Sequence, residues 1–148
     1  MKVTGAPAEG RCPRNCLEFG EWLCEEVLKA VPHRHFIFSI PKIRRRYFLY
    51  DRKLLSELSR CAWDILKVFF QTIVPEEGAI PGAVIAIQTF GDFLGYNPHF
   101  HVLCTDGGFY GKGMFRVVPW FIPKDLEKLF RYQVFKMLLS KKRPRKIW

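Results

Sequence analysis

The chain has 148 residues and a formal net charge of +10, from 24 Lys and Arg against 14 Asp and Glu. This length predicts one domain, and a hydrophobic fraction of 49% can build a packed core, which excludes a disordered basic tail. The positive excess favours nucleic acid or an anionic membrane surface as partner. No apolar run approaches the roughly 18 residues of a membrane helix, and the start lacks the apolar core of a secretory signal, so we expect no membrane partner. Five cysteines, an odd number, with Cys61 and Cys104 inside apolar stretches, predict reduced thiols and a cytoplasmic location.

The first half of the chain predicts two helices and one strand. Residues 1–10 are expected to be a loose terminus, and apolar spacing predicts a helix over residues 17–30. Residues 35–40 predict a strand that Pro41 ends. Asp51 is a candidate N-cap for a long helix that ends near Thr72. Its buried stripe is expected to contain Leu54, Leu55, Leu58, Ala62, Ile65, Leu66 and Phe69.

The second half predicts strands over residues 83–90, 98–105 and 114–119, with a turn at Asp106-Gly107-Gly108. Pro123 then opens a helix. The apolar face of that helix contains Leu126, Leu129, Phe130, Val134, Met137 and Leu138. After the first helix the element order is β-α-β-β-β-α. Because short links between consecutive strands favour antiparallel pairing, we predict an α+β fold: an antiparallel sheet with helices packed mainly on one face, preceded by a short N-terminal helix.

His99 and His101, separated by Phe100, point to the same face if they lie on a strand. A hairpin of residues 83–90 and 98–105 that sets Gln88 opposite either histidine adds an amide oxygen to that face. Two imidazoles and an amide leave coordination positions open, which suits Mg²⁺ or Mn²⁺ polarising a phosphate oxygen better than a closed structural zinc site. The alternative is an ordinary polar sheet face on which Gln88 is a surface amide.

A second histidine pair, His33 and His35, adjoins Arg34, and we interpret it as structural or phosphate-contacting. A basic segment follows the first predicted strand, and we expect it to contact DNA phosphates without reading their sequence. Its candidate DNA-binding residues are Lys42, Arg44, Arg45 and Arg46. The basic residues at 141–146 are a weaker candidate, because charge runs are commonly solvated faces or tails.

Several motifs occur in the order found in one family. Residues 31–42, 46–55, 82–92 and 97–103, followed by Asp106-Gly107, resemble IS91/IS801-type transposases, and the resemblance extends from about Arg11 to the end. That family belongs to the HUH endonucleases, named for histidine-hydrophobe-histidine. The resemblance implies a ferredoxin-like palm that cleaves and joins single-stranded DNA of a mobile element. In such proteins a tyrosine attacks a DNA phosphate with the assistance of a divalent metal and becomes linked to the 5′ end. His99 and His101 match the metal-binding pair, and Gln88 is the candidate third ligand.

The chain departs from the family pattern at two places. The nucleophilic tyrosine of the family is expected beyond Trp148, and Tyr132, which lies off its helix's apolar stripe, is expected to be a surface residue. We therefore expect a partial transposase that binds DNA without cleaving it. Cys12 and Cys16 resemble the end of the family's zinc-binding region, but the upstream cysteines are absent, so a complete structural zinc site is not expected. Residues 1–30 are then a remnant of that region plus a helix, and residues 31–148 are the palm, incomplete at its C-terminal end.

Two other functions fit parts of the sequence. A basic, non-catalytic nucleic-acid-binding module would use the same positive charge, with His99 and His101 as plain sheet residues. A nucleotide-processing enzyme of the histidine-triad kind needs a third alternating histidine, and Leu103 occupies that position. We therefore disfavour the histidine-triad alternative.

Overall fold

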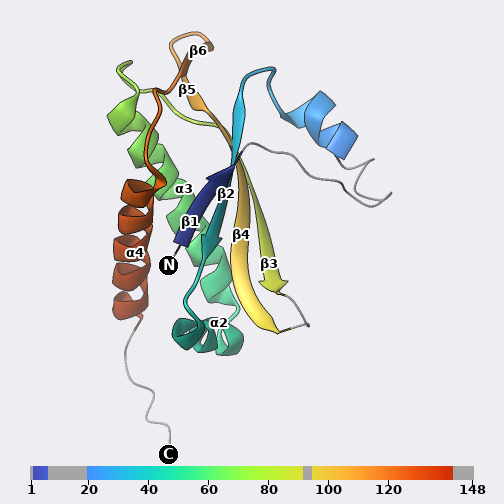
Figure 1. Ribbon diagram of the computed structural model, residues 1–148, viewed down its shortest axis with the longest axis vertical. Helices are drawn as coiled ribbons and strands as arrows, with labels where there is room; N and C mark the ends of the chain where they lie inside the picture. Colours follow the sequence, from blue (N-terminus) through green and yellow to red (C-terminus); the bar gives the residue numbers. More distant parts are fainter. Residues whose placement is uncertain (1, 7–19, 92–94, 142–148) are drawn as a thin grey trace, which may run out of the picture.

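The structure is a computed structural model that describes residues 2–6, 20–91 and 95–141. It combines a sheet, a small hairpin and helices, as the sequence predicts (Figure 1). The strands are β1 (Lys2–Ala6), β2 (His33–Ser39), β3 (Ala83–Phe90), β4 (Tyr96–Thr105), β5 (Gly107–Tyr110) and β6 (Met114–Val117). The helical elements are the π-helical η1 (Leu23–Val27), the 3₁₀ turn η2 (Lys42–Arg44), α2 (Arg45–Tyr50), α3 (Lys53–Ile73) and α4 (Pro123–Ser140).

The main sheet is antiparallel and has the strand order β1-β2-β4-β3. The antiparallel α+β fold is therefore confirmed, and β3 has the predicted bounds. The prediction of a loose terminus is wrong for Lys2–Ala6, which pairs with β2 as an edge strand. Such a strand is stabilised by backbone hydrogen bonds to its neighbour, so it needs no apolar alternation of its own.

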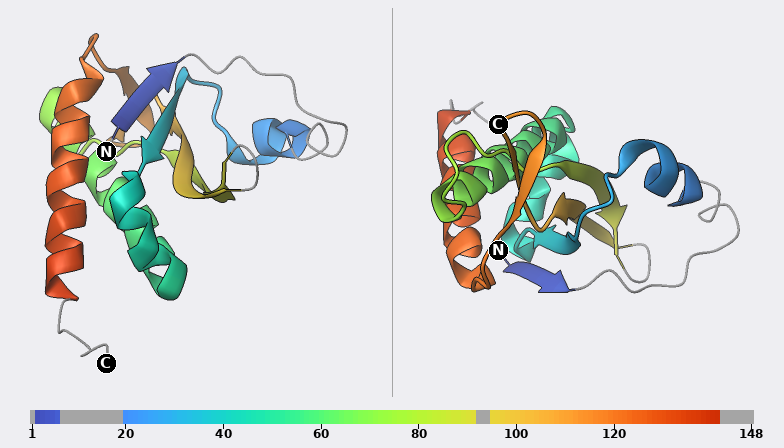
Figure 2. Two further views of the ribbon diagram at one scale, coloured as in Figure 1. Left: turned by 60° about the horizontal axis from the view of Figure 1, so that its bottom comes forward. Right: turned by 90° about the horizontal axis from the view of Figure 1, so that it is seen from above.

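The two faces of the sheet have different environments. One face carries side chains that are fully buried, namely Phe36, Phe38, Phe100, Val102 and Cys104. Helices α3 and α4 pack on this face, where the rings of Phe38 and Phe130 meet edge to face with centroids 4.8 Å apart. In Figure 2 the N-terminal helical segment that includes η1 lies on the opposite side of the sheet from α3 and α4. The helices in the described ranges therefore pack mainly on one face, and α3 and α4 leave the other face uncovered.

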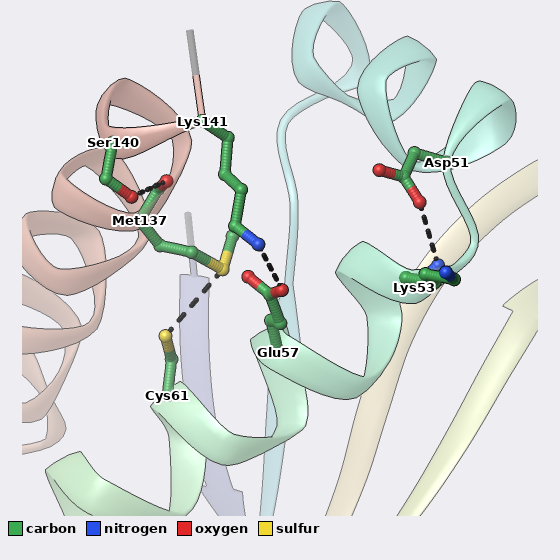
Figure 3. Close-up of polar contacts among 7 residues, drawn as sticks. All are labelled: Asp51, Lys53, Glu57, Cys61, Met137, Ser140 and Lys141. Atoms are coloured by element: carbon green, nitrogen blue, oxygen red, sulfur yellow. Dashed lines mark hydrogen bonds and ion pairs between the residues drawn. The ribbon is translucent and has the colours of Figure 1, made fainter.

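The long helix α3 and the last helix α4 lie side by side, and α3 buries its whole predicted stripe. Of the predicted face of α4, Leu126, Phe130, Val134 and Leu138 are buried. Met137 is partly buried, and the prediction is wrong for Leu129, which is exposed. Figure 3 shows two contacts between them: Cys61 Sγ lies 3.8 Å from Met137 Sδ, and Lys141 forms an ion pair with Glu57. At the start of α3 the backbone N–H of Lys53 donates to the Asp51 carboxylate over 3.1 Å, which satisfies one free N–H group of the first turn. The N-cap residue itself is Arg52, one residue after the predicted Asp51. None of the helices in the described ranges is long and apolar enough to cross a membrane.

The predicted turn at Asp106-Gly107-Gly108 is wrong, because Gly107–Tyr110 forms strand β5. It pairs with β6, the predicted strand at residues 114–119, in a separate hairpin rather than in the main sheet. A Cβ atom on Gly107 would lie 2.1 Å from the carbonyl oxygen of Arg116, so this glycine permits close approach of two strands rather than a turn. The turn itself contains Gly111 and Gly113, which both have positive φ.

Candidate metal centre and nucleic-acid interface

His99 and His101 lie on the open face of β4, because Phe100 between them points into the core. Gln88 of β3 is the register partner of His99, and Ala86 is the partner of His101. The sheet register therefore brings Gln88, His99 and His101 to one face, the arrangement on which the predicted metal site depends. A slip of one residue would have turned Gln88 toward the helices.

A third imidazole joins this pair from β2. His35 is the register partner of Leu103, so it lies diagonally across from His101. His35 Nε2 lies 3.0 Å from His101 Nδ1, and the two rings stack with centroids 5.1 Å apart. The interpretation of His35 as structural or phosphate-contacting therefore missed its contact with the histidine pair. Arg34, which precedes it, faces the other side of the sheet and pairs with Asp106 over 2.8 Å.

His99 and His101 each have a neighbour that can hold the imidazole in the tautomer whose Nε2 carries a free lone pair. His99 Nδ1 lies 2.7 Å from the backbone oxygen of Asn97, which can only accept, so His99 donates from Nδ1 and keeps a lone pair on Nε2. For His101 two assignments satisfy the geometry. If His101 Nδ1–H donates to His35 Nε2, the His101 Nε2 lone pair is free for a metal; the reverse assignment puts the proton on His101 Nε2.

Burial lowers the pKa of His101, and the neighbouring His99 and His35 lower it further. His101 is therefore neutral at pH 7. Only the neutral imidazole can donate a lone pair to a cation, so this environment favours metal binding. The rings of His99 and His101 are close enough to act together, with centroids 5.0 Å apart.

The donors on this face are two imidazoles and one amide oxygen. In the parts of the chain that the structure describes, no three His, Cys, Asp or Glu side chains form a group that could hold a metal ion. Two imidazoles and one amide oxygen leave coordination positions open, and the metal that they would hold stays a prediction.

The basic segment begins three residues after Ser39, which pairs with His99. It therefore starts at the end of the sheet that carries the histidines. Two of its members have intramolecular partners: the Arg44 guanidinium lies 3.9 Å from the centre of the Phe135 ring, and Arg45 Nε donates to the Ile40 carbonyl over 3.1 Å. Lys42 and Arg46 are exposed. Their predicted role in DNA binding remains a prediction for all four.

Three further residues that the sequence singles out lie away from the histidines or outside the described ranges. Tyr132 is exposed, and its helix α4 packs on the covered side of the sheet, opposite the histidine face (Figure 2). Cys12 and Cys16, the predicted zinc remnant, lie outside the described residues. Cys24, Cys61 and Cys104 are free thiols.

Comparison with known proteins finds sequence similarity over the part of the chain that carries these residues. Residues 82–147, which include Gln88, His99 and His101, match the family described as "Putative transposase". The transposase for insertion sequence element IS801 of Pseudomonas savastanoi pv. phaseolicola is 32% identical over 89 residues. That match covers 60% of this chain but only 21% of the relative, and no solved structure is significantly similar to the chain. These findings bear out the predicted resemblance to the IS91/IS801-type transposases.

Proposed function

We propose that this chain forms the metal-binding and DNA-binding palm of a transposase of the HUH type and acts on single-stranded DNA. The observation that supports it most directly is the shared open face of Gln88, His99 and His101, set by the register of β3 and β4. The relationship to IS801-type transposases supports DNA as the partner in general.

In this proposal His99 and His101 bind Mg²⁺ or Mn²⁺ through Nε2, and Gln88 contributes its amide oxygen. When bound, such a cation polarises a phosphate oxygen of the DNA strand. His35 and the Asn97 carbonyl accept the Nδ1 protons of the two ligands, which fixes their tautomers and ring orientations. The strand is drawn to this end of the sheet by exposed basic side chains such as Lys42 and Arg46.

Tyr132 is poorly placed to attack a phosphate held over the histidines, because its helix packs on the opposite side of the sheet. We therefore expect the chain to bind single-stranded DNA with little or no cleavage. The test is a nicking assay with labelled single-stranded DNA and Mn²⁺, run beside a binding assay on the same DNA. Strong cleavage that disappears in Tyr132→Phe would contradict this expectation.

A basic nucleic-acid-binding module without a metal is the second candidate. It is favoured by the hydrogen bond between His35 and His101, which engages one nitrogen of each ring without a cation. The double variant His99→Ala with His101→Ala separates the two functions. If the wild-type protein binds DNA with the same affinity as this variant, and added Mn²⁺ changes neither the affinity nor the melting temperature of either protein, the module is correct.

A further inference from the structure

Helix α2 is held to the domain by one side and leaves its other side exposed. Phe48 is its one buried residue in the described structure, and it anchors the helix to the core. Arg44 and Arg45, just before and at its start, also face inward, onto the Phe135 ring and the Ile40 carbonyl. The remaining side chains of α2 are exposed, namely Arg46, Tyr47, Leu49 and Tyr50.

The exposed side of this segment is aromatic and apolar. Tyr50 is 82% exposed and Tyr47 is 44% exposed, and their spacing of three residues makes them neighbours on a helix surface. Ile43, in the 3₁₀ turn before α2, is 80% exposed, and Leu49 on α2 is 52% exposed. Packing within the part of the chain that the structure describes does not explain exposed rings of this size on one short helix.

The charge around these rings identifies the kind of partner. Residues 42–53 contain six basic side chains and a single acid, Asp51. The basic residues are Lys42, Arg44, Arg45, Arg46, Arg52 and Lys53. Aromatic side chains flanked by positive charge are how proteins bind single-stranded nucleic acid, because unpaired bases stack on the rings while the phosphates meet the cations. An apolar partner surface would not need this charge.

The position of α2 agrees with that partner. It lies at the lower end of the sheet in Figure 1, beside the start of β4, and it contacts β4. Because Ser39 at the end of β2 pairs with His99, the segment leaves the sheet beside the histidine pair. Helix α2 thus lies at the same end of the sheet as the histidines, with Phe48 in the core and Arg44 against Phe135 of α4. A DNA strand that passes around this end of the sheet contacts both.

From these observations we infer that Tyr47 and Tyr50 form a stacking platform for unpaired bases of a DNA strand, with Lys42 and Arg46 holding the adjacent phosphates. This inference rests on the proposed function, since it takes single-stranded DNA as the partner. It adds two residues to which neither the sequence motifs nor the family comparison assigns a role. Duplex DNA is a poorer partner, because its bases are already stacked and paired.

The test compares two DNA probes: a short oligo-dT strand and a strand of the same length made of abasic nucleotides. Both present the same phosphates, but only the first presents bases. The variants are Tyr47→Ala with Tyr50→Ala, and Tyr47→Phe with Tyr50→Phe, which keeps the rings. Tyr132→Ala is the matched control, because Tyr132 is 66% exposed and lies among basic residues on another helix. Affinities are measured by fluorescence anisotropy at one fixed salt concentration.

The double alanine variant is expected to bind oligo-dT at least about five-fold more weakly than wild type, because it loses the stacking of at least one base. Its affinity for the abasic strand should be nearly unchanged, and the double phenylalanine variant should bind both strands like wild type. If the alanine variant binds oligo-dT as well as Tyr132→Ala does, or loses affinity equally for both strands, the platform is wrong and the proposed function survives. If light scattering shows that the double alanine variant has a different oligomeric state from wild type, the platform is also wrong, and the two tyrosines form a contact between copies of the chain. If wild type binds neither strand, the proposed function itself fails.

Discussion

His99→Ala is expected to remove most of the stabilisation that Mn²⁺ gives to the folded protein. A cation that binds the folded chain alone raises the free energy of unfolding by RT ln(1 + [L]/Kd), about 2.7 kcal/mol when Mn²⁺ is at a hundred times its Kd. For a domain of this size that corresponds to a rise in melting temperature of about 5 to 11 °C. The quantity to compare is this Mn²⁺-induced rise, because the lost hydrogen bond to Asn97 lowers the stability of the variant even without metal.

The geometry of the site predicts a graded series of variants. A partner that only orients a metal ligand typically changes affinity 10- to 100-fold, so His35→Ala should keep about 0.4 to 1.4 kcal/mol of stabilisation, a rise of about 1 to 6 °C. His99→Ala loses a ligand itself, and its rise should be about 2 °C or less. His33→Ala is the matched control, since His33 lies on the same face of β2 but at the level of Thr105, away from His101.

The assay is a thermal melt with and without Mn²⁺, at pH 7.5 and one fixed Mn²⁺ concentration for all four proteins. The expected order of the rise is wild type equal to His33→Ala, then His35→Ala, then His99→Ala. If Mn²⁺ raises the melting temperature of His99→Ala as much as that of wild type, His99 is not a metal ligand. A rise that is lost equally in His33→Ala and His99→Ala would show that the metal does not bind at this end of the sheet.

Three further results are expected. Burial lowers the pKa of His101, so the unfolded chain binds more protons than the folded chain between that lowered pKa and about 6.5. The free energy of unfolding, measured by urea titration, should therefore fall from pH 7 to pH 5. The fall should be less steep in the variant His101→Asn. Gly107→Ala should cost about 2 to 4 kcal/mol in the same titration, whereas Gly20→Ala, with open space around it, should change little. Removing one phosphate contact by Lys42→Ala or Arg46→Ala should lower the slope of log affinity for single-stranded DNA against log salt by about 0.7, while the exposed Lys136, replaced by alanine, should leave it unchanged.

The elements that the sequence predicts well are those whose own periodicity settles their structure. Helix α3 shows an apolar stripe at helical spacing, and β3 is a short apolar run bounded by Pro and Gly. In both, the local pattern and the tertiary packing agree. Strand β1 has no such pattern, and β5 begins with two glycines that are typical of a turn. Each is a strand because of the neighbour it pairs with, which a local pattern does not contain.

The candidate site divides in the same way. Alternation along one strand is enough to put His99 and His101 on one face, and a single hairpin register is enough to add Gln88. His35 requires a third piece of information, that β2 lies next to β4 with His35 diagonal to His101. The sequence does contain one signal for this contact, because His35 lies on a second predicted strand and is two residues from another histidine, His33. Strand order joins residues 66 positions apart in the chain and is fixed only by the packing of the whole sheet.

In the proposed function, the histidines and Gln88 meet the DNA phosphate on the side of the sheet that α3 and α4 leave uncovered. A helix over that side would bury His99 and His101 and exclude a phosphate, so the proposal requires this face to stay accessible. The buried phenylalanines on the other face hold β2 and β4 rigidly, which fixes the spacing of His35, His99 and His101. One face of each strand thus stabilises the fold, and the other face carries the candidate metal ligands. Phe100, between the two histidines, lies on the stabilising face.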